Sequence, residues 1–166
     1  NNFNTIYLKS LIDILKKMGA KLKVSKNSIK VSKGSKLKST SLSTSPYPGF
    51  PTDLQAQLMS LMCISDGKSK IKETIFENRF MHVPELNRLG ANITVEKDTA
   101  TIIGNQTFKG AQVMASDLRA SISLVLAAMN ANGQTTLNRV YHLDRGYENI
   151  EKTLGSLGAK IKRQKN

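Results

Sequence analysis

Hydrophobic residues recur at helical spacing over residues 5 to 18, and this pattern predicts an amphipathic helix that ends at Gly19. Its apolar stripe consists of Leu8, Leu11, Ile12, Leu15 and Met18. Residues 20 to 24 and 28 to 31 instead alternate apolar and polar side chains, which is typical of strands. The first part of the chain is therefore expected to form a helix and then a two-stranded ribbon that turns at Lys26-Asn27.

The next segment is polar and rich in turn-forming residues. Residues 36 to 45 are mainly Lys, Ser and Thr, but Leu37 and Leu42 favour a strand within them, so we place no domain boundary there. Between residues 46 and 51, three prolines and a glycine alternately fix and free the backbone. This composition predicts a shaped loop.

Helical spacing returns after this loop. Thr52 and Asp53 are candidate N-terminal caps of a helix that ends at Asp66-Gly67. The remaining predicted elements are a strand over residues 69 to 75, a helix from Pro84 to Gly90, strands over 91 to 95 and 99 to 103, and a helix that begins at Asp117.

Charge is concentrated in the stretch Thr74 to Val83, where the strand pattern gives way to a helix. Glu77, Asn78 and Arg79 stand side by side there. Apolar side chains alone would be enough to fold such a junction, so these polar residues indicate a ligand.

The chain repeats itself. Residues 115 to 126 follow the pattern of residues 51 to 62, which places Asp117 64 positions after Asp53 (117 minus 53). The glycines of three Met/Leu-Gly-Ala endings, Gly19, Gly90 and Gly158, are separated by 71 and 68 positions. A second pair of equivalent residues is Arg79 and Arg145, each predicted to follow a strand and precede a helix.

This repeat predicts a unit of strand, helix, strand, helix, strand, strand. Residues 1–45 would hold the end of one unit, residues 46–110 a complete unit and residues 111–166 most of a third, all within a single domain. One such unit cannot cover its own sheet, so the helices of successive units are expected to pack together inside an α/β domain.

Length and composition are consistent with one folded domain. The chain has 166 residues, 39% of them hydrophobic, and no apolar run approaches the ~20 residues that a membrane span needs. The first eight residues carry no signal pattern, and the sequence opens abruptly, as though inside a longer chain. The single cysteine, Cys63, excludes an internal disulfide, and its apolar neighbours favour a buried, inert thiol in a reducing cytoplasm.

A formal net charge of +13 attracts nucleic acid, anionic membranes or phosphorylated ligands. Many of the lysines are scattered over the first 40 residues and the tail with few aromatic residues between them, which indicates a solvated surface. Arg79, Arg119 and Arg145 differ, because each stands beside an acid in apolar surroundings, where a guanidinium suits a carboxylate or phosphate. No Cys/His spacing indicates a metal, and no cofactor is expected.

Two equivalent helix starts therefore present aspartates, Asp53 and Asp117, and two equivalent junctions present arginines. Helix N-termini attract anions, and a pseudo-threefold arrangement of the units would bring these ends to one face. Alternatively, the aspartates are ordinary N-terminal caps and the arginines pair with their neighbours Glu77 and Asp144. The recurrence of all four residues favours a ligand site.

Four segments, in this order and at these intervals, resemble the UDP-N-acetylglucosamine 1-carboxyvinyltransferase family of enolpyruvyl transferases. They are Pro51 to Gln57, Thr74 to Leu86, Gly110 to Ser121 and Asp144 to Glu148. The resemblance covers essentially the whole chain, least closely its first 45 residues, but only the carboxy-terminal part of that two-domain enzyme. It implies an incomplete inside-out α/β barrel of repeated βαβαββ units with buried helices.

The family transfers the enolpyruvyl group of phosphoenolpyruvate to the 3-hydroxyl of UDP-N-acetylglucosamine through a tetrahedral intermediate, the committed step towards bacterial peptidoglycan. By motif, the resemblance implies that Asp53 lies close to the sugar hydroxyl as a candidate general base. Ile75 would line the UDP-sugar site. Both substrates are therefore expected partners of this chain.

The resemblance also implies roles for the other charged residues. Arg119 and Arg145 would contact the phosphate and carboxylate of phosphoenolpyruvate. Asp117 would sit beside the transferring group and help proton movement, and Arg79 would stabilise the anionic complex or the closed state. The cysteine that protonates phosphoenolpyruvate belongs to the family's amino-terminal domain, so this chain alone is expected to be inactive.

Two alternatives stay open at this point. One is a basic repeat module that binds nucleic acid through its lysines. The other is an enzyme like 5-enolpyruvylshikimate-3-phosphate synthase. The sequence motifs Phe-Glu-Asn-Arg-Phe and Asp-Arg-Gly-Tyr-Glu favour the bacterial UDP-sugar enzyme. Neither a membrane nor a nucleic acid is an expected partner of that enzyme.

Overall fold

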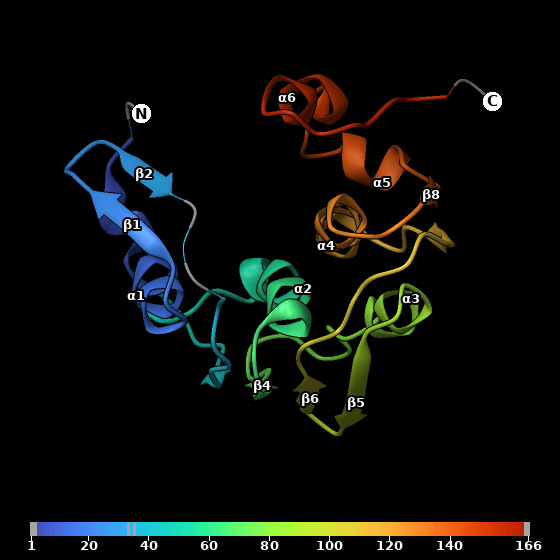
Figure 1. Ribbon diagram of the computed structural model, residues 1–166. Coiled ribbons are helices and arrows are strands. Elements are labelled where there is room, and N and C mark those ends of the chain that lie inside the picture. Colours follow the sequence, from blue (N-terminus) through green and yellow to red (C-terminus); the bar gives the residue numbers. More distant parts are fainter. Residues whose placement is uncertain (1–2, 33, 35, 165–166) are drawn as a thin grey trace.

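The computed structural model describes residues 3–32, 34 and 36–164, and Figure 1 shows their arrangement. The first elements are the 3₁₀ helix η1 (Thr5–Leu8), helix α1 (Lys9–Lys17), and strands β1 (Lys21–Val24) and β2 (Ile29–Ser32). The two strands form an antiparallel ribbon, so the predicted helix and ribbon are confirmed. Gly19 ends the helical segment with a φ of +93°, a left-handed conformation that suits glycine best.

The next elements follow the predicted order of strand, helix, strand, helix, strand, strand. They are β3 (Leu42–Ser43), α2 (Gln55–Ile64) preceded by the 3₁₀ helix η2 (Thr52–Leu54), β4 (Lys68–Lys72), α3 (Val83–Arg88), β5 (Asn92–Glu96) and β6 (Thr99–Ile103). The strands form one sheet in the order β3-β4-β6-β5. Only the β3-β4 pair is parallel, as expected for two strands joined through a helix.

The last elements begin the same order again. They are β7 (Gln112–Met114), α4 (Leu118–Met129), β8 (Thr136–Asn138), α5 (Tyr141–Asp144) and α6 (Ile150–Ser156). Strands β7 and β8 are parallel and flank α4 along the chain, as β3 and β4 flank α2. Helices α2 and α4 are therefore equivalent elements of the repeat. The division at residues 45/46 and 110/111 stays a prediction, and β3 pairs with β4 from just before residue 46.

Helices α2 and α4 pack against each other in the interior, with the sheets towards the outside (Figure 1). Met59 and Met62 of α2 and Leu124 of α4 are fully or almost fully buried. The Ser60 hydroxyl of α2 also donates a 2.9 Å hydrogen bond to the Ser123 carbonyl of α4. Each helix covers the apolar side of the other and removes it from water, and this burial is the main stabilising contribution of such packing.

Two expectations about local structure are wrong. The strand predicted over residues 69 to 75 ends at Lys72, and the chain then forms turns until α3 begins at Val83. Arg145 does not directly follow a strand, because the short helix α5 lies between β8 and this residue. Within the described part of the chain, no helix is both long and apolar enough to cross a lipid bilayer.

Candidate functional site

Asp53 and Arg119 are in direct contact, although they belong to different units of the repeat. Asp53 lies in η2, at the start of the α2 segment, and Arg119 is the second residue of α4. The Arg119 Nε donates a 2.7 Å hydrogen bond to Asp53 Oδ1, and this bond raises the pKa of the Arg119 guanidinium. The side chains keep 37% and 60% of their surface exposed, so both remain accessible to a ligand.

Asp117 is the N-terminal cap of α4, as the sequence predicted. Its Oδ1 accepts the backbone N–H groups of Arg119 at 2.8 Å and Ala120 at 3.0 Å. The extended backbone of Asp117, with φ of −157°, places the carboxylate across the first turn. The Asp117 carboxylate is therefore fixed beside the residue whose side chain contacts Asp53.

Asp53 is not the cap that the sequence predicted. Pro51 precedes η2 and Leu54 precedes α2, and neither helix start has a capping side chain. The 3₁₀ turn puts Asp53 inside the helical segment, where its carboxylate turns towards Arg119 instead of its own backbone. The prediction that Asp53 and Asp117 cap their helices alike is wrong for this reason.

The turn segment after β4 carries Ile75 and Arg79. Ile75 is 44% exposed and Phe76 56% exposed, so this segment presents apolar side chains to solvent. The Arg79 Nε donates a 3.1 Å hydrogen bond to the Thr52 hydroxyl, and the guanidinium lies 4.2 Å from the centre of the Phe76 ring. Arg79 thus contacts Thr52 and Phe76 among the described residues, so the alternative pairing with Glu77 is wrong.

His82 is the last residue of this segment, directly before α3, and is almost completely buried. Burial lowers the pKa of its imidazole to about 4, while the negative charge of Asp117 acts in the opposite direction. The His82 Nε2 lies 3.3 Å from the Met59 sulfur. The effect of the Asp117 charge indicates that the end of the turn segment lies near this carboxylate, and the burial of His82 makes it a packing residue.

Arg145 stands at the end of α5 with its side chain exposed. Its neighbour Asp144 accepts two hydrogen bonds, of 2.9 and 2.6 Å, from Arg163, and these bonds lower the Asp144 pKa. The alternative pairing of Arg145 with Asp144 is therefore wrong. The next residue, Gly146, lies against Leu118 so closely that an added Cβ would be 2.9 Å from the Leu118 Cδ2 atom.

The predicted site residues are connected to one another to different degrees. Asp53, Asp117 and Arg119 are joined by hydrogen bonds. Arg79 is joined through Thr52, the neighbour of Asp53. Arg145 is placed only through its neighbours, since Gly146 packs on Leu118 and Tyr147 acts electrostatically on Arg119.

Sequence reasoning missed two residues of this network, Thr52 as a hydrogen-bond relay and Glu73. Thr52 was noted only as a candidate cap. Glu73 accepts four hydrogen bonds. One of them comes from the backbone N–H of Ile75 and connects Ile75 to the site. An isolated glutamate between Lys72 and Thr74 carries no recognisable sequence signal, because its partners become visible only in the fold.

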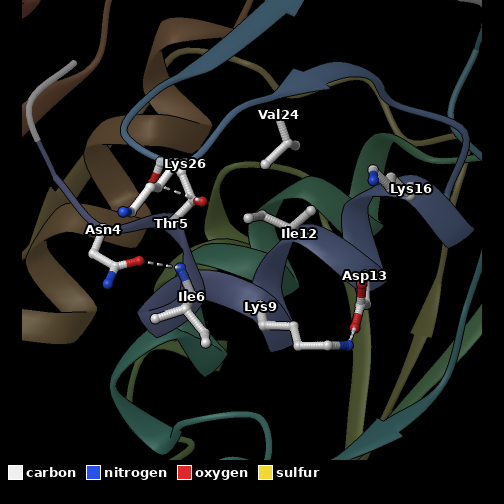
Figure 2. A pocket seen from close by; sticks show the side chains of 9 residues that line it. All are labelled: Asn4, Thr5, Ile6, Lys9, Ile12, Asp13, Lys16, Val24 and Lys26. Carbon is white, nitrogen blue, oxygen red and sulfur yellow. Dashed lines mark hydrogen bonds and ion pairs between the residues drawn. The ribbon is translucent and has the colours of Figure 1, made fainter.

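Other polar or hollow regions do not include these residues. A surface hollow of about 480 Å³ lies between η1, α1 and the β1-β2 turn. Its lining residues are shown in Figure 2, and they include Lys9 and Asp13, which form an ion pair of 2.6 Å. A second hollow of about 450 Å³ is lined mostly by apolar residues of α1, α2 and α4. Cys63 is fully buried and its burial raises the thiol pKa to about 12. The described residues contain no cluster of His, Cys, Asp or Glu suited to a metal ion.

Comparison with known proteins decides the family. A family model described as EPSP synthase (3-phosphoshikimate 1-carboxyvinyltransferase) matches residues 2–154. The chain belongs to this family. A curated relative from Pelagibacter ubique (strain HTCC1062), named UDP-N-acetylglucosamine 1-carboxyvinyltransferase, is 59% identical over 152 residues, which are 92% of this chain and 36% of the relative. The chain therefore spans little more than a third of that relative's length.

Two solved structures, of an enolpyruvyl transferase and of an EPSP synthase, have the same fold. The enolpyruvyl transferase NikO from Streptomyces tendae superposes with a TM-score of 0.86 at 32% identity, over 93% of this chain and 36% of that one. EPSP synthase from Acinetobacter baumannii superposes with a TM-score of 0.66 at 18% identity, over 94% of this chain and 37% of that one. The resemblance to UDP-N-acetylglucosamine 1-carboxyvinyltransferases and the enolpyruvyl transferase fold are confirmed, whereas closure of the barrel stays a prediction.

Proposed function

We propose that this chain is the substrate-binding carboxy-terminal part of an enzyme that transfers the enolpyruvyl group of phosphoenolpyruvate to the 3-hydroxyl of UDP-N-acetylglucosamine. The name of the Pelagibacter ubique relative supports this acceptor. The reaction would serve peptidoglycan synthesis in the bacterial cytoplasm. The proposal includes an inside-out barrel of repeated βαβαββ units, of which this chain would supply the end of one unit, one complete unit and most of a third.

The observation that carries the proposal is the 2.7 Å contact between Arg119 and Asp53. Transfer to a hydroxyl requires a base beside that hydroxyl and a cationic group beside the phosphoenolpyruvate anion. This contact supports the proposal, because one candidate for each role would lie within reach of a single pair of substrates. Asp117 would lie beside the transferring group, because its carboxylate bonds to the backbone of Arg119.

In the proposed addition, Asp53 accepts the proton of the sugar 3-hydroxyl while the hydroxyl oxygen bonds to C2 of phosphoenolpyruvate and C3 takes up a proton. In the elimination, C3 releases a proton, the bond between C2 and the phosphate oxygen breaks, and phosphate leaves. Arg119 and Arg145 would bind the phosphate and carboxylate. Since Arg119 holds Asp53 in the free chain, binding of the phosphate would draw the guanidinium away and release the base.

The remaining groups of the site would bind rather than react. Ile75 would line the UDP-sugar site, and Arg79 would stabilise the anionic complex or its closed state. Cys63 would not protonate C3, because a fully buried thiol with a pKa of about 12 supplies no accessible proton. We therefore propose that the acid comes from the amino-terminal domain of the family and that this chain alone is inactive.

The test is turnover by the complete gene product with phosphoenolpyruvate and UDP-N-acetylglucosamine. Phosphate release and a mass increase of the sugar nucleotide by one enolpyruvyl group are the expected results. Absence of both would contradict the proposal. The 166-residue chain, assayed in parallel, should give no product, and measurable product would refute its inactivity.

A second acceptor has support of its own, since the family model that matches residues 2–154 is described as 3-phosphoshikimate 1-carboxyvinyltransferase. The same assay with 3-phosphoshikimate in place of the UDP-sugar separates the two. Turnover with 3-phosphoshikimate alone would favour this second function. Turnover with UDP-N-acetylglucosamine alone would support the first.

A further inference from the structure

Glu73 is a buried carboxylate directly after β4, with 6% of its surface exposed. A buried negative charge is costly unless it is paired or hydrogen-bonded. Among the ion pairs of the described residues, none involves Glu73. Its carboxylate instead accepts four hydrogen bonds, and the donors of these bonds indicate the role of the residue.

The first two bonds come from the backbone of the turn segment. Glu73 Oε1 accepts the N–H groups of Ile75 at 2.9 Å and Phe76 at 3.2 Å. The residues Ile75 and Phe76 are 44% and 56% exposed, so burial of apolar surface does little to hold this part of the segment. The Glu73 carboxylate therefore holds the backbone at Ile75 and Phe76, directly after Thr74, which is bonded to Thr44.

The other two bonds come from threonine hydroxyls on distant segments. Thr44, after β3, donates to Oε1 at 2.7 Å, and Thr52, in η2, donates to Oε2 at 2.9 Å. The Thr44 hydroxyl also accepts the N–H of Thr74 at 2.8 Å. Glu73 thus joins the turn segment to the segments on both sides of the proline-rich loop.

Two routes lead from Glu73 to Arg79. The Thr52 hydroxyl donates its proton to Glu73 and accepts the Arg79 Nε–H at 3.1 Å, so the carboxylate sets which way this hydroxyl points. The Phe76 backbone is bonded to Glu73, and the Phe76 ring lies under the Arg79 guanidinium at 4.2 Å. Thr52 is also the neighbour of Asp53 in η2.

We infer that Glu73 is a positioning residue of the UDP-sugar subsite. Its carboxylate fixes Ile75 and Arg79 relative to Asp53 before the sugar nucleotide binds. This inference rests on the proposed function, because it assigns the acceptor to that subsite. It predicts that loss of the carboxylate weakens binding of UDP-N-acetylglucosamine far more than it disturbs the fold.

The test variant is Glu73→Gln in the complete gene product, with UDP-N-acetylglucosamine affinity measured by titration calorimetry. Glutamine keeps the size of the side chain, but its NH₂ group cannot accept the Thr52 proton. A loss of about tenfold in affinity is expected from one broken and several weakened hydrogen bonds. In turnover, KM for the sugar nucleotide should rise by a similar factor, with a smaller change in kcat.

The matched control is Asn87→Ala, which removes a side chain that bonds to both backbone groups of Ile93, at 2.9 and 3.0 Å, in the same α/β unit. It should lower thermal stability without changing affinity for the sugar nucleotide. Equal losses of affinity in Glu73→Gln and Asn87→Ala would overturn the inference, because the effect would then be general destabilisation. Unchanged affinity in Glu73→Gln would also overturn it.

A second variant covers the case in which Glu73→Gln does not fold. Thr52→Val cuts only the relay between Glu73 and Arg79 and leaves the three other bonds to the carboxylate in place. An affinity loss of about threefold is expected, and unchanged affinity overturns the inference. If the unaltered protein does not bind UDP-N-acetylglucosamine at all, the proposed function fails and the inference fails with it, whereas normal binding with unaffected variants overturns the inference alone.

Discussion

The segments that lead into α2 and α4 both contain Asp-Leu, but the two aspartates make different contacts. Asp117 precedes α4 and accepts two N–H groups of the first turn. Asp53 lies within a 3₁₀ turn before α2, caps nothing and accepts the side chain of Arg119. One aspartate bonds to the backbone of its own helix, and the other bonds to a cationic side chain of the other helix.

Thr52 and Glu73 account for part of this difference. The Thr52 hydroxyl is bonded to the buried Glu73, which joins the start of η2 to the turn segment after β4. Ser116, the residue before Asp117, makes a local bond to the Asp117 carboxylate at 3.3 Å instead. The comparison shows that equivalent positions of a repeat serve different purposes when one of them is tied to a distant segment.

The largest effect on activity is expected at Asp53, and it tests the difference between the two aspartates. Asp53→Asn removes the proposed base and should lower turnover of the complete gene product by about 10²- to 10⁴-fold. Its unfolding curve should be almost unchanged, because the Arg119 pair is solvent-exposed. A rate within a few-fold of the unaltered protein would remove Asp53 from the chemistry. Asp13→Asn, at an exposed aspartate that pairs with Lys9, is the matched control.

The next largest effect is expected at Arg119. Arg119→Ala should reduce kcat/KM by about 10²- to 10³-fold, since the proposed cationic contact to the phosphoenolpyruvate anion is lost. Arg119→Lys should recover only part of this, because an ammonium group lacks the guanidinium fork. Arg88→Ala, at an arginine paired with Glu85 in α3, should leave steady-state kinetics unchanged. Full activity of Arg119→Lys would show that bidentate binding is unnecessary.

A pH effect on stability is expected at His82, which lies near Asp117. Folding lowers the His82 pKa from an ordinary 6.5 to about 4, so the unfolded chain takes up the proton first as the pH falls. The contribution of neutral His82 is complete above pH 6.5 and is lost towards pH 4, by up to about 3 kcal/mol. Urea unfolding of the complete gene product between pH 7 and pH 4 measures this loss.

His82→Leu should flatten that pH dependence, while His142→Gln serves as the control at the second histidine. An unchanged pH dependence in His82→Leu would contradict the assignment. An NMR titration of His82 distinguishes the two aspartates. Asp117→Asn should lower the His82 pKa further, because it removes a negative charge that favours the protonated imidazole. Asp53→Asn, which is not among the causes of the shift, should not move it.

The smallest effect is expected from the caps themselves. Asp117→Ala should destabilise the protein by about 1 kcal/mol, because two N–H groups lose their acceptor. Asp53→Ala should change stability by less than about 0.5 kcal/mol. Hydrogen exchange at the Arg119 and Ala120 amides gives a local measure, and it should accelerate only in Asp117→Ala. Equal destabilisation by both variants would contradict the difference between the two helix starts.

Much of the fold was predictable because its patterns are local. The stripe from Leu8 to Met18, the alternation in β1 and β2, and the repeat of Asp-Leu helix starts each occupy a short window of sequence. The strand predicted over residues 69 to 75 failed because Glu73 takes the N–H groups of Ile75 and Phe76, which a sheet would otherwise have used. The two hydroxyls that also bond to Glu73 belong to Thr44 and Thr52, 29 and 21 positions away, so a short window of sequence does not show what holds the carboxylate there.

By itself, the sequence determined the elements, their repeated order and the family motifs, since periodicity and turn chemistry act between neighbours along the chain. Tertiary structure decided the partners of the charged residues. Arg119 meets Asp53 across 66 positions, and Asp144 pairs with Arg163 rather than with Arg145. Such pairs depend on how α2 packs against α4 and on how the ends of the units meet. A charged side chain pairs with the opposite charge that the folded chain brings within hydrogen-bond distance.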